Sequence, residues 1–367
     1  MIDPRMEKLA KTLVNYSVKV KPGDWVVISS HKVAEPLAAE VYRYVLRAGG
    51  YPSLLMSSDA IAETLFKEAS DEQLKHVSPF ERLPFEEADV YINIQAAENT
   101  RNLSQIDPAR MQLRSAARKG IMDSYLKRSA EGSLRWTLTN YPCAAYAQEA
   151  DMTLLEYEDF IFRATFCDQD DPVKAWNKIE ANQQRLVNWL KGKKKIHLFS
   201  PNIDLQLGID GRTFINSTGT HNMPSGEIFT GPEEQSANGW VEFTYPAITG
   251  GREVDGVRLE FKDGLVVKST AKKNEAYLLK MLEQDAGAKR LGELGIGTNY
   301  GITQFTKSIL YDEKIGGTIH LALGASYPET GGKNESGLHW DMICDMRKDS
   351  EIVVDGKLFY KDGEFKI

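Results

Sequence analysis

The chain of 367 residues is poor in cysteine, and its three cysteines are not placed to act together. Cys143, Cys167 and Cys344 are widely separated, and no C-x-x-C pair occurs. Neither a thiolate zinc site nor a disulfide framework is therefore indicated. This usage fits a reducing compartment, and we expect a cytoplasmic protein.

The chain also lacks an excess of basic residues, long hydrophobic runs and the usual nucleotide-binding motifs. Its net charge is −7, which argues against nucleic acid or an anionic membrane surface as a partner. We expect neither a signal peptide nor a transmembrane span. The motifs G-x-G-x-x-G after a strand, G-x-x-x-x-G-K-[ST] and G-x-S-x-G are absent. A dinucleotide site, a P-loop and a nucleophile elbow are thus unsupported.

The first half of the sequence alternates between predicted strands and helices. "WVVIS" (25–29) and "YPSLLM" (51–56) are typical of buried strands, and "EPLAAEVYRYVLRAGG" (35–50) between them is typical of a helix that ends at glycine. This is a strand–helix–strand unit, which places the two strands in parallel. Further strands are predicted at 88–96 and 135–142. We predict an α/β domain over 1–192 with an open, largely parallel sheet.

The second half has a different pattern. Helices are predicted within 151–192, and from residue 193 apolar and polar residues alternate with period two around Asp-Gly turns such as Asp263-Gly264. We predict a β-rich α+β domain over 193–367, which would carry the chemistry.

Candidate functional residues lie in four short segments of this second half. "PSGEIFTGP" contains Glu227 among turn-forming and apolar residues, and "LGELGIGTN" contains Glu293 without a nearby basic partner. "TIHLALGASY" contains His320 and Tyr327, and "LHWDMI" contains His339 and Asp341. The last two side chains lie on the same face of a strand, because side chains alternate with period two.

These residue types together indicate a metal centre. A buried carboxylate without a partner costs several kcal/mol, and a divalent cation removes that cost. Two histidines, three carboxylates and a phenol are too many for one tetrahedral ion and suit two ions that share a carboxylate. Mixed nitrogen and oxygen ligands favour zinc, cobalt or manganese. Taken singly, each residue has an ordinary structural alternative, such as a loop cap, a salt-bridge partner or packing. The remaining histidines of the first half, His31 and His76, are expected at the surface.

Several segments, in the same order over nearly the whole chain, resemble the thermophilic metallo-aminopeptidase family of the aminopeptidase T, aminopeptidase S and PepS type. They are "VKPGDWVVISS", "AAEN" (96–99), "NMPSGEIFTGP", "FKDGLVV", "IHLALGASYP" and "GLHWDMI". The resemblance implies a homodimer and a dinuclear site. Carried over residue by residue, that site falls on Glu227, Glu293, His320, Tyr327, His339 and Asp341. One departure is Gly226, because family members commonly have a carboxylate at that position.

The function that follows is a metal-dependent aminopeptidase acting on peptides with a free N-terminus. Two divalent ions would lower the pKa of a shared water, and the resulting hydroxide would attack the first peptide bond. Glu227 and Tyr327 are the catalytic candidates, Tyr327 as a stabiliser of the oxyanion. Two alternatives stay open: a non-catalytic, metal-stabilised binding protein descended from the peptidase, and a nucleotide-binding phosphoryl-transfer enzyme.

Overall fold

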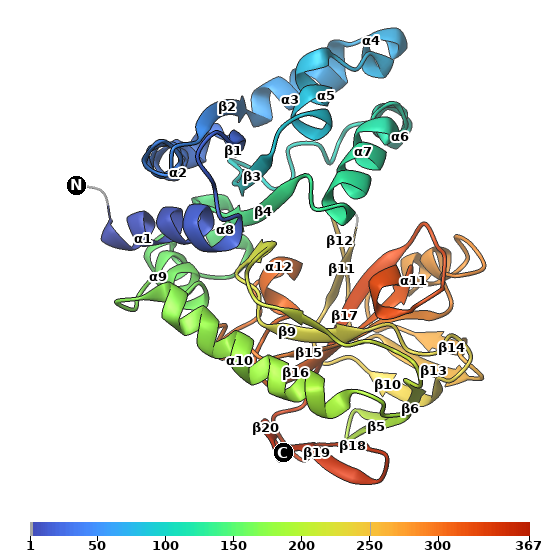
Figure 1. The fold of residues 1–367 in the computed structure, drawn as a ribbon. Helices are drawn as coiled ribbons and strands as arrows, with labels where there is room; N and C mark the ends of the chain where they lie inside the picture. Colours follow the sequence, from blue (N-terminus) through green and yellow to red (C-terminus); the bar gives the residue numbers. More distant parts are fainter. Residues whose placement is uncertain (1–2, 250) are drawn as a thin grey trace. The chain divides into compact units, whose positions relative to one another are not determined.

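The computed structural model describes residues 3–249 and 251–367, which form two compact units (Figure 1). The first unit extends to Lys174 and also includes Gly219–Pro224. The second comprises Ala175–Thr218 and Ser225–Ile367. Each unit has its own sheets, and each is described by itself below.

The first unit is built on a five-stranded parallel sheet with the order β2-β1-β3-β4-β8. Its strands are β1 (Trp25–His31), β2 (Tyr51–Ser57), β3 (Val90–Gln95), β4 (Arg135–Asn140) and β8 (Asn222–Met223). Val26, Val27 and Ile28 follow one another in β1 and are all buried. A run that is buried on both faces is typical of a parallel sheet covered by helices. The predicted open parallel sheet is confirmed.

Helices connect these strands and cover the sheet. They are α1 (Pro4–Thr12), α2 (Glu35–Arg47), α3 (Asp59–Glu68), α4 (Asp71–Lys75), α5 (Pro79–Glu86), α6 (Pro108–Ala117), α7 (Lys119–Ala130), α8 (Ala144–Glu149) and α9 (Leu154–Ala164), with short helical turns at Leu13–Ser17 and Lys32–Ala34. Local sequence fixes several of their ends. The side chain of Asp3 caps α1, and Pro4 follows at its first position.

The second unit consists mainly of antiparallel strands. An eight-stranded sheet has the order β14-β13-β10-β6-β5-β18-β19-β20, a five-stranded sheet has the order β17-β16-β15-β9-β7, and β11 pairs with β12. The strands are β5 (Lys195–Ser200), β6 (Ile203–Gly208), β7 (Ile215–Ser217), β9 (Glu227–Thr230), β10 (Asn238–Glu242), β11 (Ala247–Thr249), β12 (Arg252–Val254), β13 (Arg258–Lys262), β14 (Leu265–Thr270), β15 (Leu291–Gly297), β16 (Thr318–Gly324), β17 (His339–Asp345), β18 (Glu351–Val354), β19 (Lys357–Lys361) and β20 (Glu364–Phe365). The helices are α10 (Pro172–Leu190), α11 (Glu275–Leu282) and α12 (Ile309–Asp312), with a short helical turn at Pro328–Thr330. The predicted β-rich α+β domain is confirmed.

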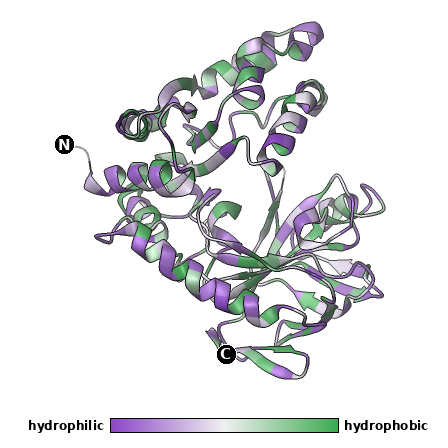
Figure 2. Ribbon diagram, viewed as in Figure 1, coloured by the Kyte–Doolittle hydropathy of each residue, from purple (hydrophilic) through white to green (hydrophobic). Residues whose placement is uncertain are grey.

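The long helix α10 explains where the second unit begins. Hydrophobic and hydrophilic residues alternate along it (Figure 2), and Leu186 and Leu190 on its apolar side belong to the core of the second unit. The units consequently divide near the start of this helix, after Lys174, whereas the sequence predicts a boundary after it, at 192/193. The short strand β8 is a second difference, since it lies far along the chain yet pairs with β4 in the first unit.

Helices that could cross a membrane are not found in the described part of the chain, because none is both long and apolar enough.

Candidate metal centre

The candidate ligands converge because four neighbouring strands of the five-stranded sheet each contribute at least one. Glu227 begins β9, Glu293 lies in β15, His320 in β16, and His339 and Asp341 in β17. Register aligns them: Glu293 pairs with Ala322, and Ala322 pairs with Asp341 on the other side. Residues in one row of a sheet point to the same face. Five side chains that are more than 100 residues apart at their extremes therefore meet on one face.

The carboxylate of Glu293 lies between the two imidazoles. Its Oε1 is 3.3 Å from Nε2 of His320, and its Oε2 is 3.3 Å from Nε2 of His339. Nε2 of His320 is also 3.4 Å from Oε2 of Glu227, and Nε2 of His339 is 3.6 Å from Oδ2 of Asp341. Two groups of potential metal ligands result, Glu227–Glu293–His320 and Glu293–His339–Asp341. They share Glu293, as a bridging carboxylate would.

Both imidazoles are oriented through their other nitrogen. Nδ1 of His320 lies 2.9 Å from the carbonyl oxygen of Glu313, and Nδ1 of His339 lies 2.9 Å from that of Ala325. A carbonyl oxygen only accepts, so each Nδ1 carries a proton and donates it. A neutral ring with its proton on Nδ1 has its Nε2 lone pair free for a metal, which is the usual arrangement of histidine ligands.

Burial makes the charges of this centre expensive without cations. His320 is fully buried, and Glu227 and Glu293 are 5% and 4% exposed. Within the described residues, Oε2 of Glu227 and Oδ1 of Asp341 are buried and make no hydrogen bond. Buried carboxylate oxygens that lack hydrogen-bond donors are well suited to a divalent ion. The residues present therefore fit a metal site.

The pKa values of these side chains show how burial and neighbouring charges act on them. Burial raises the pKa of Glu227 to about 7 and that of Asp341 to about 6. Burial alone would also raise the pKa of Glu293, but hydrogen bonds from His320 and His339 lower it to about 2. Conversely, burial disfavours charged imidazole, yet the hydrogen bonds with Glu293 and the neighbouring carboxylates raise the pKa of His320 to about 10 and that of His339 to about 9. The imidazoles and the Glu293 carboxylate thus stabilise each other's charged forms.

Tyr327 is placed differently from the other five candidates. It follows β16 and is 42% exposed. Its ring packs edge-on against the imidazole of His339, with the ring centroids 5.2 Å apart, and also contacts Phe229. Burial of the hydroxyl and the charges of Glu293 and Asp341 raise the pKa of Tyr327. The structure therefore brings five of the six predicted residues into direct polar contact and places the sixth beside them.

Two charged residues of the centre were missed from the sequence. Lys314 is completely buried, with Nζ 3.6 Å from Oε1 of Glu227 and in close contact with Oε1 of Glu313. Glu313 also forms a third group of potential ligands with His320 and Asp341. In the sequence, "DEKIGG" is typical of an exposed charged turn before a strand. The only local signal was the Gly-Gly pair that follows, which predicts a turn but not burial.

Two positions at the centre have no room for a larger residue than glycine. Gly295 lies opposite His320 in the register, and a Cβ added to it would come within 1.9 Å of Cε1 of the imidazole. Gly226, at the position where the resemblance implies a carboxylate, has a φ of +112°, and a Cβ there would lie 2.7 Å from Cβ of Asn299. This backbone conformation favours glycine.

Gln183 of α10 holds the strand that begins with Glu227. Its Nε2 donates to the carbonyl oxygen of Glu227 at 2.7 Å and to Oδ1 of Asn216 at 2.7 Å, and its Oε1 accepts from the hydroxyl of Thr298 at 2.8 Å. The Gln183 side chain is 1% exposed. Buried polar groups of this kind are satisfied only in one arrangement, so they fix the position of the ligand strand.

Solved structures with the same fold include proteins of different chemistry. The structure of wild-type AmpT from Thermus thermophilus superimposes with a TM-score of 0.86 at 22% identity and covers 99% of each chain. A 2,5-dihydroxypyridine dioxygenase from Pseudomonas putida KT2440 gives a TM-score of 0.58 at 14% identity, over 98% of this chain and 96% of that one. At these identities the likeness shows the fold alone.

Similarity in sequence identifies the family, which the likeness in fold does not. Aminopeptidase 2 of Geobacillus stearothermophilus is 26% identical, over 99% of this chain and 95% of its own length. Aminopeptidase PepS of Streptococcus thermophilus is 26% identical, over 98% of this chain and 95% of its own length. The profile of the thermophilic metalloprotease (M29) family matches residues 2–365. This match confirms the resemblance seen in the motifs and the expected enzyme class, a metal-dependent hydrolase of peptide bonds. The chain belongs to the thermophilic metalloprotease (M29) family.

Proposed function

We propose that this protein is an aminopeptidase that removes N-terminal residues from peptides at a centre of two divalent ions. The observation that carries the proposal is the position of Glu293, whose two carboxylate oxygens each face the Nε2 atom of a different histidine. The names of the proteins that are similar in sequence, which are aminopeptidases, support the choice of substrate. Zinc, cobalt and manganese suit this set of nitrogen and oxygen ligands.

The proposed ligands are the five residues in polar contact, Glu227, Glu293, His320, His339 and Asp341, with Tyr327 beside them as a sixth. When bound, two such ions supply a Lewis acid for the scissile carbonyl and a water nucleophile at neutral pH.

The side chains of the centre would orient the ligands and transfer protons during the reaction. The carbonyl oxygens of Glu313 and Ala325 hold the two imidazoles with Nε2 directed into the centre. Glu227 is the proposed base, because only its Oε2 faces the imidazole of His320, while its Oε1 faces the ammonium group of Lys314. The partly exposed Tyr327 is proposed to donate a hydrogen bond to the developing oxyanion.

Three further features complete the proposal. A free α-amine of the substrate would be held at the same centre, which would restrict cleavage to the N-terminus. We propose a homodimer, in line with the family resemblance, and a cytoplasmic location, in line with the three unpaired cysteines.

The test is hydrolysis of leucine and methionine amides and of short peptides before and after chelation. We expect chelation to abolish activity and added zinc, cobalt or manganese to restore it. Peptides with an acetylated N-terminus should stay intact. Glu293→Gln should lower kcat/KM by at least about 100-fold, on the scale of losing one essential catalytic group, whereas Glu283→Gln, an exposed carboxylate of the same unit, should leave it unchanged. Full activity of the metal-free protein would refute the proposal.

Two outcomes would favour the alternatives. Tight metal binding without hydrolysis of any peptide in a broad panel would indicate a binding protein. Calorimetric binding of a nucleotide would indicate the phosphoryl-transfer enzyme, which no motif in the chain supports.

A further inference from the structure

A second cluster of potential metal ligands lies in the first unit, at the carboxyl ends of its parallel strands. His31 is the last residue of β1, Asp59 begins α3 just after β2, and Glu98 follows β3. The chain runs from β1 outward to β2 on one side and then to β3 on the other, so the sheet has its topological switch between β1 and β3. In open α/β sheets, ligands bind outside the carboxyl ends of the strands at this switch.

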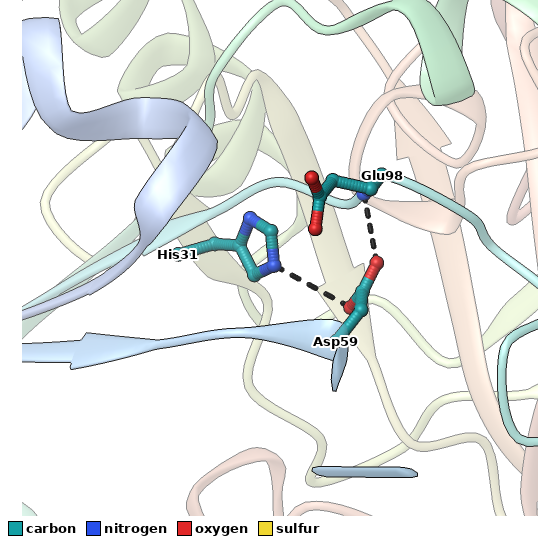
Figure 3. Close-up of side chains that lie close together, drawn as sticks. All are labelled: His31, Asp59 and Glu98. Atoms are coloured by element: carbon teal, nitrogen blue, oxygen red, sulfur yellow. Dashed lines mark hydrogen bonds and ion pairs between the residues drawn. The ribbon is translucent and has the colours of Figure 1, made fainter. Parts of the chain in front are cut away.

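His31 is buried, which corrects the expectation that it lies at the surface. Its side chain is 6% exposed, whereas those of Asp59 and Glu98 are 21% and 46% exposed. Figure 3 shows the imidazole pointing toward the Asp59 carboxylate, with the Glu98 carboxylate above the ring. Nε2 of His31 lies 3.4 Å from Oδ1 of Asp59. The cluster is therefore closed at the histidine and open to solvent at the glutamate.

One atom of the His31 side chain and one of the Asp59 side chain already have a structural role. Nδ1 of His31 accepts the backbone N–H of Val33 at 3.3 Å and caps the turn that follows β1. Oδ2 of Asp59 accepts the backbone N–H groups of Glu98 and Asn99 at 2.8 and 3.1 Å. These contacts hold the three segments together. They leave Nε2 of His31 and Oδ1 of Asp59 facing each other.

The atoms that face the cluster are only partly satisfied by partners in the chain. Within the described chain, Nε2 of His31 is buried and makes no hydrogen bond. Lys32 pairs with Glu98 at 2.8 Å, but both side chains are 46% exposed, and a pair of this kind contributes little. One donor atom from each of the three residues lies within 4.8 Å of the others. Two ligands of a tetrahedral zinc ion, each about 2.0–2.1 Å from it, are about 3.4 Å apart, which is the separation of His31 and Asp59.

We propose that His31, Asp59 and Glu98 bind a divalent transition-metal ion of the zinc type, separate from the centre in the second unit. One imidazole and two carboxylates suit such an ion and leave a coordination position for water or an exogenous ligand. A hard cation such as magnesium prefers oxygen ligands alone and should bind weakly. This site does not depend on the proposed aminopeptidase activity.

Metal binding here requires a change of tautomer. While Nδ1 accepts the N–H of Val33, a neutral ring carries its proton on Nε2. Coordination through Nε2 moves that proton to Nδ1 and gives up the contact with Val33, which at 3.3 Å is longer than a normal hydrogen bond. The switch is observable by NMR of the ¹⁵N-labelled ring.

Equilibrium dialysis of the full-length protein with zinc, and anomalous scattering at the zinc edge, test the proposal. The wild-type protein should bind one ion more than His31→Asn, and an anomalous peak should lie between His31 and Asp59. Asparagine keeps an acceptor near the position of Nδ1 but has no Nε2, so the cap is preserved. Asp59→Asn, which keeps one acceptor oxygen for the backbone N–H groups, should weaken binding of this ion at least about tenfold. Glu68→Gln, an exposed carboxylate on the same helix α3, is the matched control and should bind zinc as the wild type does.

Equal zinc stoichiometry in wild type and His31→Asn would overturn the proposal. The proposal would also be overturned if wild-type crystals soaked in zinc showed an anomalous peak at the centre of the second unit but none at His31. The second measurement uses no variant, so it decides the question even if the substitutions affect folding. Loss of peptidase activity in these variants is not required.

Discussion

Replacement of Lys314 by methionine should destabilise the metal-free protein strongly. Lys314 is fully buried, and its ammonium group lies 3.6 Å from Glu227 and against Glu313. Burial opposes its charge, but the two carboxylates outweigh that effect and raise the pKa of Lys314, so the ammonium stays charged. Methionine keeps most of the apolar stem of lysine and removes the ammonium group with its charge and hydrogen-bond donors. Removing one partner of a buried ion pair costs about 3–5 kcal/mol, because the other charge is left uncompensated.

Urea unfolding of the chelated protein measures this change. The free energy of unfolding should fall by about 3–5 kcal/mol in Lys314→Met. Adding Glu227→Gln should recover part of the loss, with a coupling energy of about 0.5–3 kcal/mol. With zinc bound, the loss should be smaller, since the ion compensates the same carboxylate. The reasoning is refuted if Lys314→Met changes the stability of the chelated protein by less than about 1 kcal/mol, or if the two substitutions are additive.

Three further substitutions test the construction of the centre. Gly295→Ala should displace the imidazole of His320, which a Cβ would approach to 1.9 Å; we expect weaker zinc binding by dialysis and a loss of stability of about 1–3 kcal/mol, as for other overpacked cores. Gly226→Asp, which restores the carboxylate typical of the family, should lower the melting temperature, because of the positive φ and the contact with Asn299, and should not raise the number of bound ions. Gln183→Leu leaves buried polar groups of the ligand strand unsatisfied, which costs about 1–3 kcal/mol for each such group; zinc affinity should fall with stability, whereas Asn182→Leu on the exposed side of the same helix should change neither.

The fold of the first unit could be predicted because its signals are local. The elements predicted at 25–29, 35–50 and 51–56 correspond to β1, α2 and β2. They differ from them by at most two residues at the strand ends and by three at the end of the helix. A strand–helix–strand unit is specified by consecutive residues, so periodicity and caps suffice. The strand β8 was not predictable in this way. It is two residues long and pairs with β4, more than 80 residues earlier.

The candidate centre was partly predictable for a different reason. His339 and Asp341 share a face because of period-two alternation within one strand. The meeting of Glu227, Glu293 and His320 depends on the register of three separate strands, which no local pattern fixes; here the order of the family motifs supplied the prediction.

Lys314 and His31 were not recognised because burial is a tertiary property. Lys314 stands in a charged turn and His31 beside another basic residue, and both positions are ordinarily exposed. Lys314 is buried because its turn is bound to another loop: the backbone of Asn299 donates to the carbonyl oxygen of Lys314. His31 is buried because it ends a central strand, and the segments after β2 and β3 close over it.

The segment "TIHLALG" shows why one strand can serve the core and a metal centre together. Ile319, Leu321 and Leu323 alternate along β16 and belong to the hydrophobic core of the second unit. His320 lies between them on the opposite face. Two of its neighbours on that face are small, Ala322 on its own strand and Gly295 across from it on β15, whereas Ile343 lies across from it on β17. A large side chain at either neighbouring position would fill the space that the ligands need. The diagnostic feature of this motif is therefore a histidine whose neighbour two residues along the strand is small, while the other face of the strand is apolar throughout. A histidine without such a neighbour would indicate only a buried strand.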